Sequence, residues 1–329
     1  MMQIKIGGRM FKWMTGVLMC AFALHVAAQS FPNRPVKIIV PYAAGGGPDI
    51  DARKLAPRLS DALGVPVVVE NRVGAAGILA AEVAMQAAPD GYTLLAGGVS
   101  HVVQKILRPQ ARFDPLTSFV HIGLTSNSTT VLVVPMDSPV KTAKDLEALL
   151  RSKPGQINYG SGGIGTAAHI AGSSFVNLLK LNAVHIPYRG SVELMPALVG
   201  GQIQFAFPIA GTGVPMVKSG KARALAVTGA KRLSSLPDVP TMKELYGEEL
   251  FVQEAWGGLW APAGTPAAEV QKLHGALKQA LSDADLRNYF VGAGSEVEIS
   301  PSPESFSSFL RAETQKWAKI IQLTGVKAD

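Results

Sequence analysis

The sequence of 329 residues contains one cysteine, Cys20, and it lies in an N-terminal segment that we expect to be removed. The exported protein would then have no thiol nucleophile and no disulfide, so its stability has to come from its core. The chain also lacks a Gly-x-Ser-x-Gly elbow, and its histidines do not combine with other ligands at metal-site spacing. We therefore predict no catalytic residues, no metal site and no cofactor, and hence no enzyme.

Long apolar runs are missing after the first 30 residues, which excludes an internal spanning helix built from about 18 such residues. At the N-terminus, Lys5, Arg9 and Lys12 precede an apolar stretch, and Val26–Ala28 offers small residues for cleavage. This order is typical of a secretory signal peptide. We predict that residues 1–28 are removed and that the protein is periplasmic.

Three alternatives remain at this N-terminus. Cleavage after Ser30 is one, and an uncleaved anchor is another. Lipidation of Cys20 is the third, which the bulky Met19 in front of it disfavours.

Clustered positive charge is also absent. The formal net charge is +7, but no run of Lys and Arg is interleaved with aromatic residues. We therefore expect no nucleic-acid partner. A mild positive balance is compatible with an anionic ligand.

Short β-branched runs alternate with helix-like runs along the chain. The expected strands are 36–40, 67–70, 93–96, 131–134, 184–186, 203–207, 224–227 and 258–260, and the expected helices are 49–63, 78–87, 142–152, 166–180, 191–199, 214–219, 266–282 and 303–323. This alternation favours an α/β fold with mixed, mostly parallel sheets covered by helices on both faces.

Two of the expected strands end in proline, Val131–Val134 at Pro135 and the run through Trp260 at Pro262. We interpret them as crossover strands that join two lobes. Lobe 1 would contain residues 31–128 and 256–329, and lobe 2 residues 129–255. Two connecting strands form a hinge, and ligands favour such interfaces.

Two glycine-rich turns each lie between an expected strand and an expected helix. The first is Gly45-Gly46-Gly47-Pro48-Asp49, and the second spans 160–166. A turn that opens a helix gathers free backbone N–H groups and the positive end of the helix dipole, which suits an anion. An ordinary tight turn is the alternative. If both turns face the cleft, they hold an anion from two sides.

The second turn also matches the dinucleotide pattern Gly-x-Gly-x-x-Gly. A dinucleotide site needs an acid about 20 residues later, where this chain has His185–Tyr188. An anion site that adds the hydroxyls of Ser161 and Thr166 is the more economical interpretation. Asp49 and Asp51 point in different directions, so a catalytic carboxylate pair is not expected.

Some positions have two interpretations. His169 either donates to the anion or is simply packed. Arg189 either adds a charge-assisted bond in the cleft or is a solvated loop residue. For Trp256 and Trp260 we expect core packing.

Several segments resemble the Bug-type receptors, the solute-binding proteins of tripartite tricarboxylate transporters. They are 31–35, 40–49, 67–72, 88–95, 185–190, 225–228 and 236–241, and the resemblance extends from about residue 31 to the end. It implies a two-lobed periplasmic binding fold of type II that closes on a small carboxylate held where the two turns meet. It also implies integral membrane subunits of the transporter as partner. We expect the receptor to be a monomer.

The chain departs from the family pattern at Pro48, Ala167, Ala168 and Pro208, where the family often has polar residues, an acid at the last of these. The pocket becomes less polar, and the missing acid disfavours an amino-acid ligand. We therefore predict a carboxylate with an apolar body. The residues expected to bind it are Tyr42, Gly46, Gly47, Pro48, Asp49, Ser100, Ser161, Gly163, Gly165, Thr166, Ala167, His169 and Pro208.

Two rival functions remain open. A periplasmic sensor that signals to a membrane kinase would have the same fold and cleft. An α/β hydrolase-type enzyme or a dehydrogenase would need a nucleophile–base pair or a cofactor loop, and neither is evident.

Overall fold

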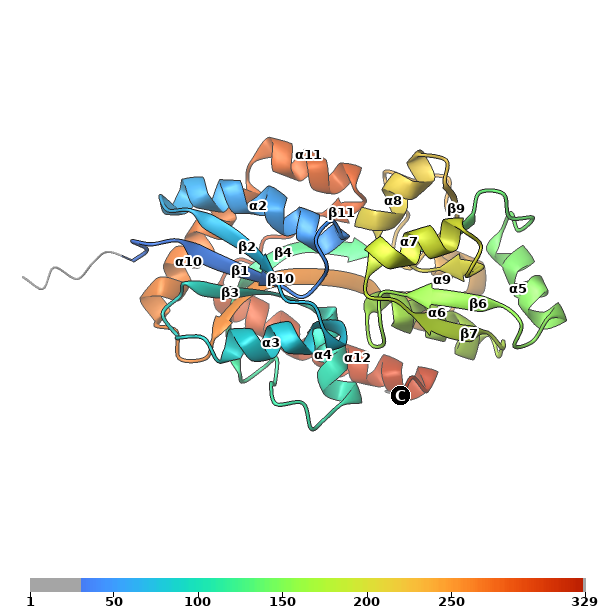
Figure 1. Ribbon diagram of the computed structural model, residues 1–329, viewed down its shortest axis with the longest axis horizontal. Helices are drawn as coiled ribbons and strands as arrows, with labels where there is room; N and C mark the ends of the chain where they lie inside the picture. Colours follow the sequence, from blue (N-terminus) through green and yellow to red (C-terminus); the bar gives the residue numbers. More distant parts are fainter. Residues whose placement is uncertain (1–30, 328–329) are drawn as a thin grey trace, which may run out of the picture. The chain divides into compact units, whose positions relative to one another are not determined.

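The computed structural model describes residues 31–327, so the predicted signal peptide and Cys20 lie outside the described residues. Arg34–Asp329 form one compact unit. Its elements build two sheets flanked by helices (Figure 1), which confirms the predicted α/β class. Within the described range, no helix has the length and apolar character needed to cross a membrane.

The first sheet has the order β11-β4-β10-β3-β1-β2. Its strands are β1 (Val36–Val40), β2 (Val67–Asn71), β3 (Thr93–Gly98), β4 (Phe119–Thr129), β10 (Glu254–Pro262) and β11 (Ser295–Glu296). β1 is parallel to β2 and β3, whereas β10 is antiparallel to β3 and β4, and β11 to β4. The sheet is mixed, and its antiparallel share is larger than expected. The reason is β4, which pairs antiparallel with β10 and β11 and which the sequence pattern did not predict, because half of its residues are polar.

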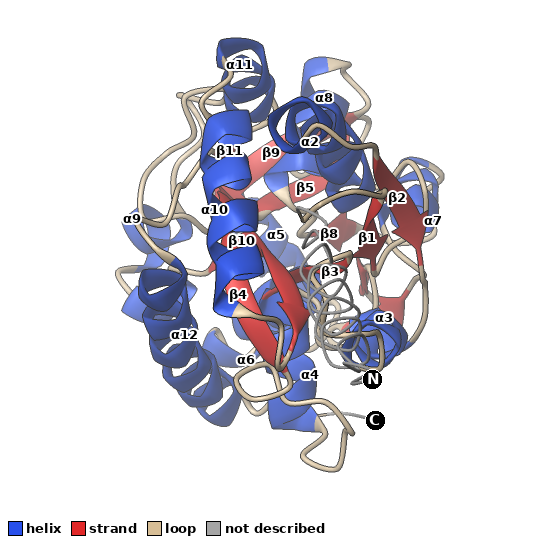
Figure 2. Cartoon of the chain, turned by 90° about the vertical axis from the view of Figure 1, so that its left-hand side faces the viewer, coloured by secondary structure: helices blue, strands red, loops and turns tan. Residues whose placement is uncertain are grey.

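Helices cover both faces of this sheet (Figures 1 and 2). On one side lie α2 (Gly47–Leu63), α10 (Ala267–Leu281) and α11 (Ala284–Gly292); on the other lie α3 (Ile78–Met85), α4 (Val99–Leu107) and α12 (Pro303–Thr324), with the short turn Ala75–Gly77. The core under α4 and α12 is aromatic, with Trp260, Phe306 and Trp317 fully buried.

The second sheet has the order β7-β6-β8-β5-β9. Its strands are β5 (Val131–Pro135), β6 (Asn158–Ser161), β7 (Val184–Pro187), β8 (Phe205–Ala206) and β9 (Ala222–Val227), and its helices are α5 (Ala143–Ser152), α6 (Ala167–Leu178), α7 (Ser191–Val199), α8 (Ala210–Lys218) and α9 (Met242–Tyr246), with a single turn Glu249–Phe251. β6 is parallel to its neighbours and β5 antiparallel to its own.

β5 shows why this sheet is covered on both faces. Leu132 and Val134 join the core under α5 and α6, while Val131 and Val133 join the core under α7 and α8. Successive side chains of a strand point to opposite faces, so a continuous apolar run requires two covers.

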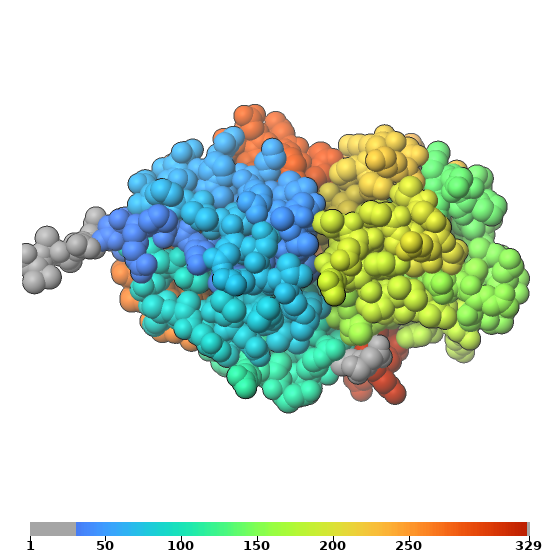
Figure 3. Space-filling view, in the orientation of Figure 1, coloured from blue at the N-terminus to red at the C-terminus, as the bar shows by residue number. Residues whose placement is uncertain are grey.

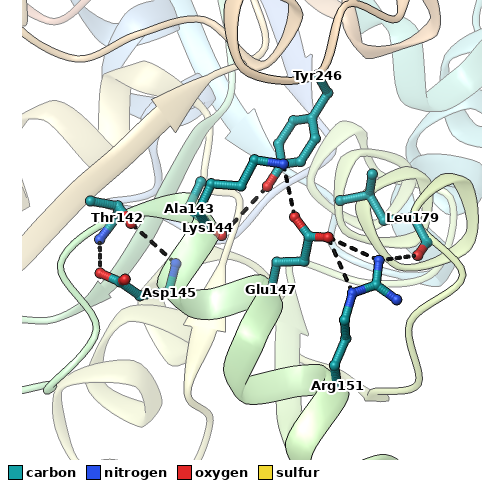
Figure 4. Close-up of polar contacts among 8 residues, drawn as sticks. All are labelled: Thr142, Ala143, Lys144, Asp145, Glu147, Arg151, Leu179 and Tyr246. Carbon is teal, nitrogen blue, oxygen red and sulfur yellow. Dashed lines mark hydrogen bonds and ion pairs between the residues drawn. The ribbon is translucent and has the colours of Figure 1, made fainter.

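α5 is fixed by polar contacts at its exposed side (Figure 4). Thr142 caps the helix by accepting a hydrogen bond from Asp145 N, and Glu147 accepts from Lys144 and Arg151. Arg151 also donates to the Leu179 carbonyl, which ties α5 to the end of α6. Burial opposes ionisation of Glu147, but these two cations outweigh it and lower its pKa.

A buried hydroxyl connects the two passages of the chain between the sheets. Thr228 Oγ1 donates to the Gln253 carbonyl at 2.7 Å and accepts from Thr130 N at 3.1 Å. It also shares hydrogen bonds with the hydroxyls of Thr129 and Thr130. Thr129 ends β4, and Gln253 immediately precedes β10, so Thr228 holds both connections together.

Thr228→Val keeps the shape of the side chain and removes these bonds. We expect a loss of about 1–2 kcal/mol in the free energy of unfolding, because buried backbone partners lose their hydrogen bonds. Urea unfolding measures this change in the free energy of unfolding. Thr228→Ser, which retains the hydroxyl, is the control and should lose less; equal losses in the two variants would contradict the role of the oxygen.

Candidate functional site

A cavity of about 180 Å³ lies among elements of both sheets. On the face drawn in Figure 3, the blue to cyan segments of the first sheet border the yellow to green segments of the second. Strand β10 contributes the wall residues Trp256, Gly257 and Gly258, and β4 contributes Thr125, Ser126 and Ser128.

Several helices begin at this cavity. The lining residues at helix starts are Gly46 and Pro48 of α2, Gly98, Val99 and Ser100 of α4, Thr166, Ala167 and Ala168 of α6, Gly190 and Ser191 of α7, and Ile209 of α8. The first N–H groups of a helix have no partner within the helix, and its start carries a partial positive charge. Pro48 has no N–H and the Gly46 N–H donates to the Ala43 carbonyl, so at α2 the helix dipole, and at α4 and α6 the amides that follow the cap, are what suit an anion here.

Charged side chains are nearly absent from this wall. Among the described residues that line it, Asp51 alone carries a formal charge, and none is Lys or Arg. Burial lowers the pKa of His101 to about 4, so its ring is neutral at pH 7. An anion in this cavity would be held by amides and hydroxyls.

Tyr42 and Ser100 supply two of the hydroxyls. Their oxygens are 2.8 Å apart and share a hydrogen bond that joins the end of β1 to α4. Burial raises the pKa of Tyr42, so the phenol stays a neutral donor. Both residues line the cavity, and their contact with a ligand stays a prediction.

The first glycine turn divides into two parts. Gly46 and Pro48 line the cavity, while Gly47 and Asp49 do not belong to its lining. Asp49 is 1% exposed, and its carboxylate accepts hydrogen bonds from Gly45 N, Arg53 Nε and Asn71 Nδ2. Burial opposes its ionisation, but these donors outweigh it and lower its pKa. Asp49 thus holds the turn in shape.

The second glycine turn satisfies many of its own polar groups. Ser161 Oγ accepts from Gly163 N and shares a hydrogen bond with His185 Nε2. Thr166 Oγ1 accepts from His169 N as the cap of α6 and donates to the Gly163 carbonyl. Only the helix start, Thr166 to Ala168, and Gly162 reach the cavity wall.

Gly165 shows why glycine is needed in this turn. Its φ is +80°, and a Cβ there would lie 2.4 Å from Gln104 Nε2 of α4. That nitrogen donates to the Ile164 carbonyl, so a helix of the first sheet contacts a turn of the second. The left-handed backbone disfavours any larger residue, and a Cβ would in addition displace the Gln104 amide from this contact.

The predicted residues can now be placed. Tyr42, Gly46, Pro48, Ser100, Thr166, Ala167 and Pro208 line the cavity, whereas Gly47, Asp49, Ser161, Gly163, Gly165 and His169 lie outside its lining. The structure brings both glycine turns to one cavity, but direct ligand contact stays a prediction for each residue.

The structure also shows the surroundings of the residues for which the sequence allowed two interpretations. His169 is buried, stacks on His185 with ring centroids 4.1 Å apart, and accepts from Gly165 N, which favours packing. Arg189 is exposed, with its backbone N–H donating to Glu193. Trp256 and Trp260 are buried in the core as expected, although Trp256 also borders the cavity.

The helix α4 was not expected from the sequence, and the helix expected at 191–199 coincides with α7, but its start was not assigned to the ligand site. Gly97-Gly98 ends β3 and Gly190-Ser191 lies shortly after β7, in the same order of strand, glycine and helix that identified the first two turns. The signal was therefore present. It was overlooked because Val99–Leu107 is short and largely apolar, and because Gly190 is a single glycine.

Comparison with known proteins places this geometry in a family. A family model described as the tripartite tricarboxylate transporter family receptor matches residues 51–326. A UPF0065 protein in the gbd 5′ region of Cupriavidus necator is 36% identical, over 94% of this chain and 93% of that protein. The resemblance inferred from the segments is confirmed.

Solved structures agree. The periplasmic binding protein BugD has a TM-score of 0.86 and 34% identity over 91% of this chain and all of that one. MatC from Rhodopseudomonas palustris, solved with bound malate, has a TM-score of 0.83 and 30% identity over 88% of this chain and all of that one. The family and these neighbours are substrate-binding receptors, which confirms the prediction of a receptor and not an enzyme. The chain belongs to the tripartite tricarboxylate transporter receptor family.

Proposed function

We propose that this protein is a periplasmic receptor that captures a small carboxylate in the cavity and delivers it to integral membrane subunits of a tripartite tricarboxylate-type transporter. One observation carries the proposal. The starts of α2, α4, α6, α7 and α8 meet at a cavity whose lining has no Lys or Arg. Backbone amides at helix starts bind carboxylates without a cationic side chain.

The family supports the ligand class. MatC, a relative over most of the chain, holds malate. In this chain each charge-assisted hydrogen bond from an amide or hydroxyl to the carboxylate would contribute roughly 1.5–3 kcal/mol.

The proposed working cycle needs two lobes and a hinge. We assign residues 31–128 and 256–329 to lobe 1 and residues 129–255 to lobe 2, with the hinge at the connections that Thr228 holds. Closure about such connections would bury the ligand. Export would depend on removal of residues 1–28, and the receptor would act as a monomer.

A thermal-shift screen tests the ligand class. Small mono- and dicarboxylic acids at millimolar concentration are expected to raise the melting temperature, since a ligand bound only to the folded state stabilises it by mass action. Neutral sugars and organic cations of similar size are the controls. If those raise the melting temperature and no acid does, the proposal is wrong.

A further inference from the structure

One face of α2 forms a side of the cavity. The lining residues on this helix are Pro48, Asp51, Ala52 and Leu55, spaced three and four apart, which places them in one stripe. Three of them are apolar, and Asp51 interrupts them. A carboxylate on an apolar stripe of a cavity wall needs a partner, because burying an unpaired charge is costly.

Few groups of the protein stabilise a charge on Asp51. Tyr289 Oη of α11 donates to its Oδ1 at 3.3 Å, and no other described side chain donates to it or forms an ion pair with it. Lys54, on the next turn of α2, has its ammonium 5.4 Å from the Tyr289 ring. Near α8, the residues that line the cavity are Pro208 and Ile209, neither of which carries a charge. Tyr289 is thus the titratable group that faces Asp51.

These surroundings shift the pKa of Asp51. Burial raises the pKa of Asp51 to about 7, against the opposing effect of the Tyr289 hydrogen bond. This carboxyl group therefore holds its proton at a higher pH than an exposed aspartate does. An incoming cation would favour the ionised form and remove this penalty.

We propose that Asp51, which lines the cavity and accepts a hydrogen bond from Tyr289, forms a second polar pole that binds a protonated amine on the ligand while the helix starts bind its carboxylate. This assignment rests on the proposed function and narrows its ligand class to zwitterionic amino acids with an apolar spacer. It also differs from the expectation drawn from Pro208, because the acid that would receive the amine lies on α2.

Helix geometry sets the spacer length. Asp51 lies five residues beyond Gly46, the cap of α2, which is a rise of about 7.5 Å between the two backbone positions at 1.5 Å per residue and gives the scale of the separation between the poles. An α-amino acid carries both groups on one carbon and is too short to reach both poles. An ω-amino acid with several methylenes fits the separation.

Isothermal titration calorimetry with three matched probes tests the second pole. 5-Aminopentanoate carries the amine, pentanoate lacks it, and adipate replaces it with a second carboxylate. We expect wild-type protein to bind 5-aminopentanoate at least tenfold more tightly than pentanoate, and adipate more weakly than 5-aminopentanoate.

Asp51→Asn is the matched variant, because it keeps the shape and hydrogen-bonding capacity and removes the charge. In this variant 5-aminopentanoate and pentanoate should bind within threefold of each other, and adipate should bind more tightly than it does to wild type. Tyr289→Phe should produce a smaller change in the same direction.

A pH series on wild-type protein provides a readout that needs no variant. Asp51 ionises as the pH rises through about 7, so the affinity for 5-aminopentanoate should rise between pH 6 and 8 and the affinity for adipate should fall.

The outcomes separate this inference from the proposed function. If pentanoate and 5-aminopentanoate bind wild type equally well, the carboxylate receptor stands and the second pole is wrong. If adipate binds more tightly than the other two probes and loses affinity in Asp51→Asn, a protonated Asp51 donates a hydrogen bond to the second carboxylate of the ligand. That result also overturns the inference. If no acid binds either protein, both proposals fail.

Discussion

Ala167→Asp is expected to lower the affinity for a carboxylate ligand at least 100-fold. Ala167 is the first residue of α6 and lines the cavity, so an aspartate there would lie among the amides proposed for the ligand. A like charge at this short distance inside a partly enclosed site costs several kcal/mol. Titration calorimetry with the acid that gives the largest thermal shift measures the loss.

The same variant should fold at least as well as wild type. An acid in the first turn of a helix interacts favourably with the helix dipole and contributes about 0.3–1 kcal/mol. Ala167→Asn, similar in volume and uncharged, is the control and should retain most of the affinity. Equal affinities in the two variants would show that the carboxylate is not held at the start of α6.

The strand–glycine–helix pattern predicted much of this site, because it is a local property of the chain. It identified β1 from Val36 to Val40 and the starts of α2 and α6, and both turns reach one cavity. A strand of β-branched residues, a glycine that opens the turn and an amphipathic helix each leave a signature within a few residues.

Hydroxyl groups were harder to assign. Ser161 and Thr166 were predicted to bind the ligand, yet both hydroxyls are engaged in the turn itself. Thr is a preferred helix cap whose oxygen accepts a hydrogen bond from the third residue of the helix. The capping role of Thr166 could therefore be predicted from the sequence. The partner of Ser161 is His185, 24 residues away, and only the fold reveals it.

Long-range contacts account for the other omissions. Asp51 appeared only as the neighbour of Asp49, because nothing local connects it to Tyr289 at the far end of the chain. β4 was missed since its second half is polar and faces the cavity at Thr125, Ser126 and Ser128, which removes the apolar pattern of a strand.

Glu313→Ala is expected to lower the free energy of unfolding by about 3 kcal/mol, more than Thr228→Val does. Glu313 is 8% exposed, and its Oε2 accepts hydrogen bonds from Trp256 Nε1 at 2.7 Å and Trp317 Nε1 at 2.9 Å. Removing the carboxylate leaves two buried indole donors without a partner, at about 1–3 kcal/mol each. Urea unfolding followed by circular dichroism measures the change.

Glu313→Ala should also loosen the cavity wall, because Trp256, which loses its hydrogen-bond acceptor, belongs to β10 and borders the cavity. Glu313→Gln keeps one acceptor oxygen for the indoles and should lose less than half as much stability. Lys316, whose partly exposed ammonium donates to Oε1, offers the matched comparison: Lys316→Ala removes this contact within α12, leaves both indole donors paired, and should change stability by less than about 1 kcal/mol. If Lys316→Ala costs as much as Glu313→Ala, the ion pair within α12 and not the indole contacts would account for the stability that Glu313 contributes.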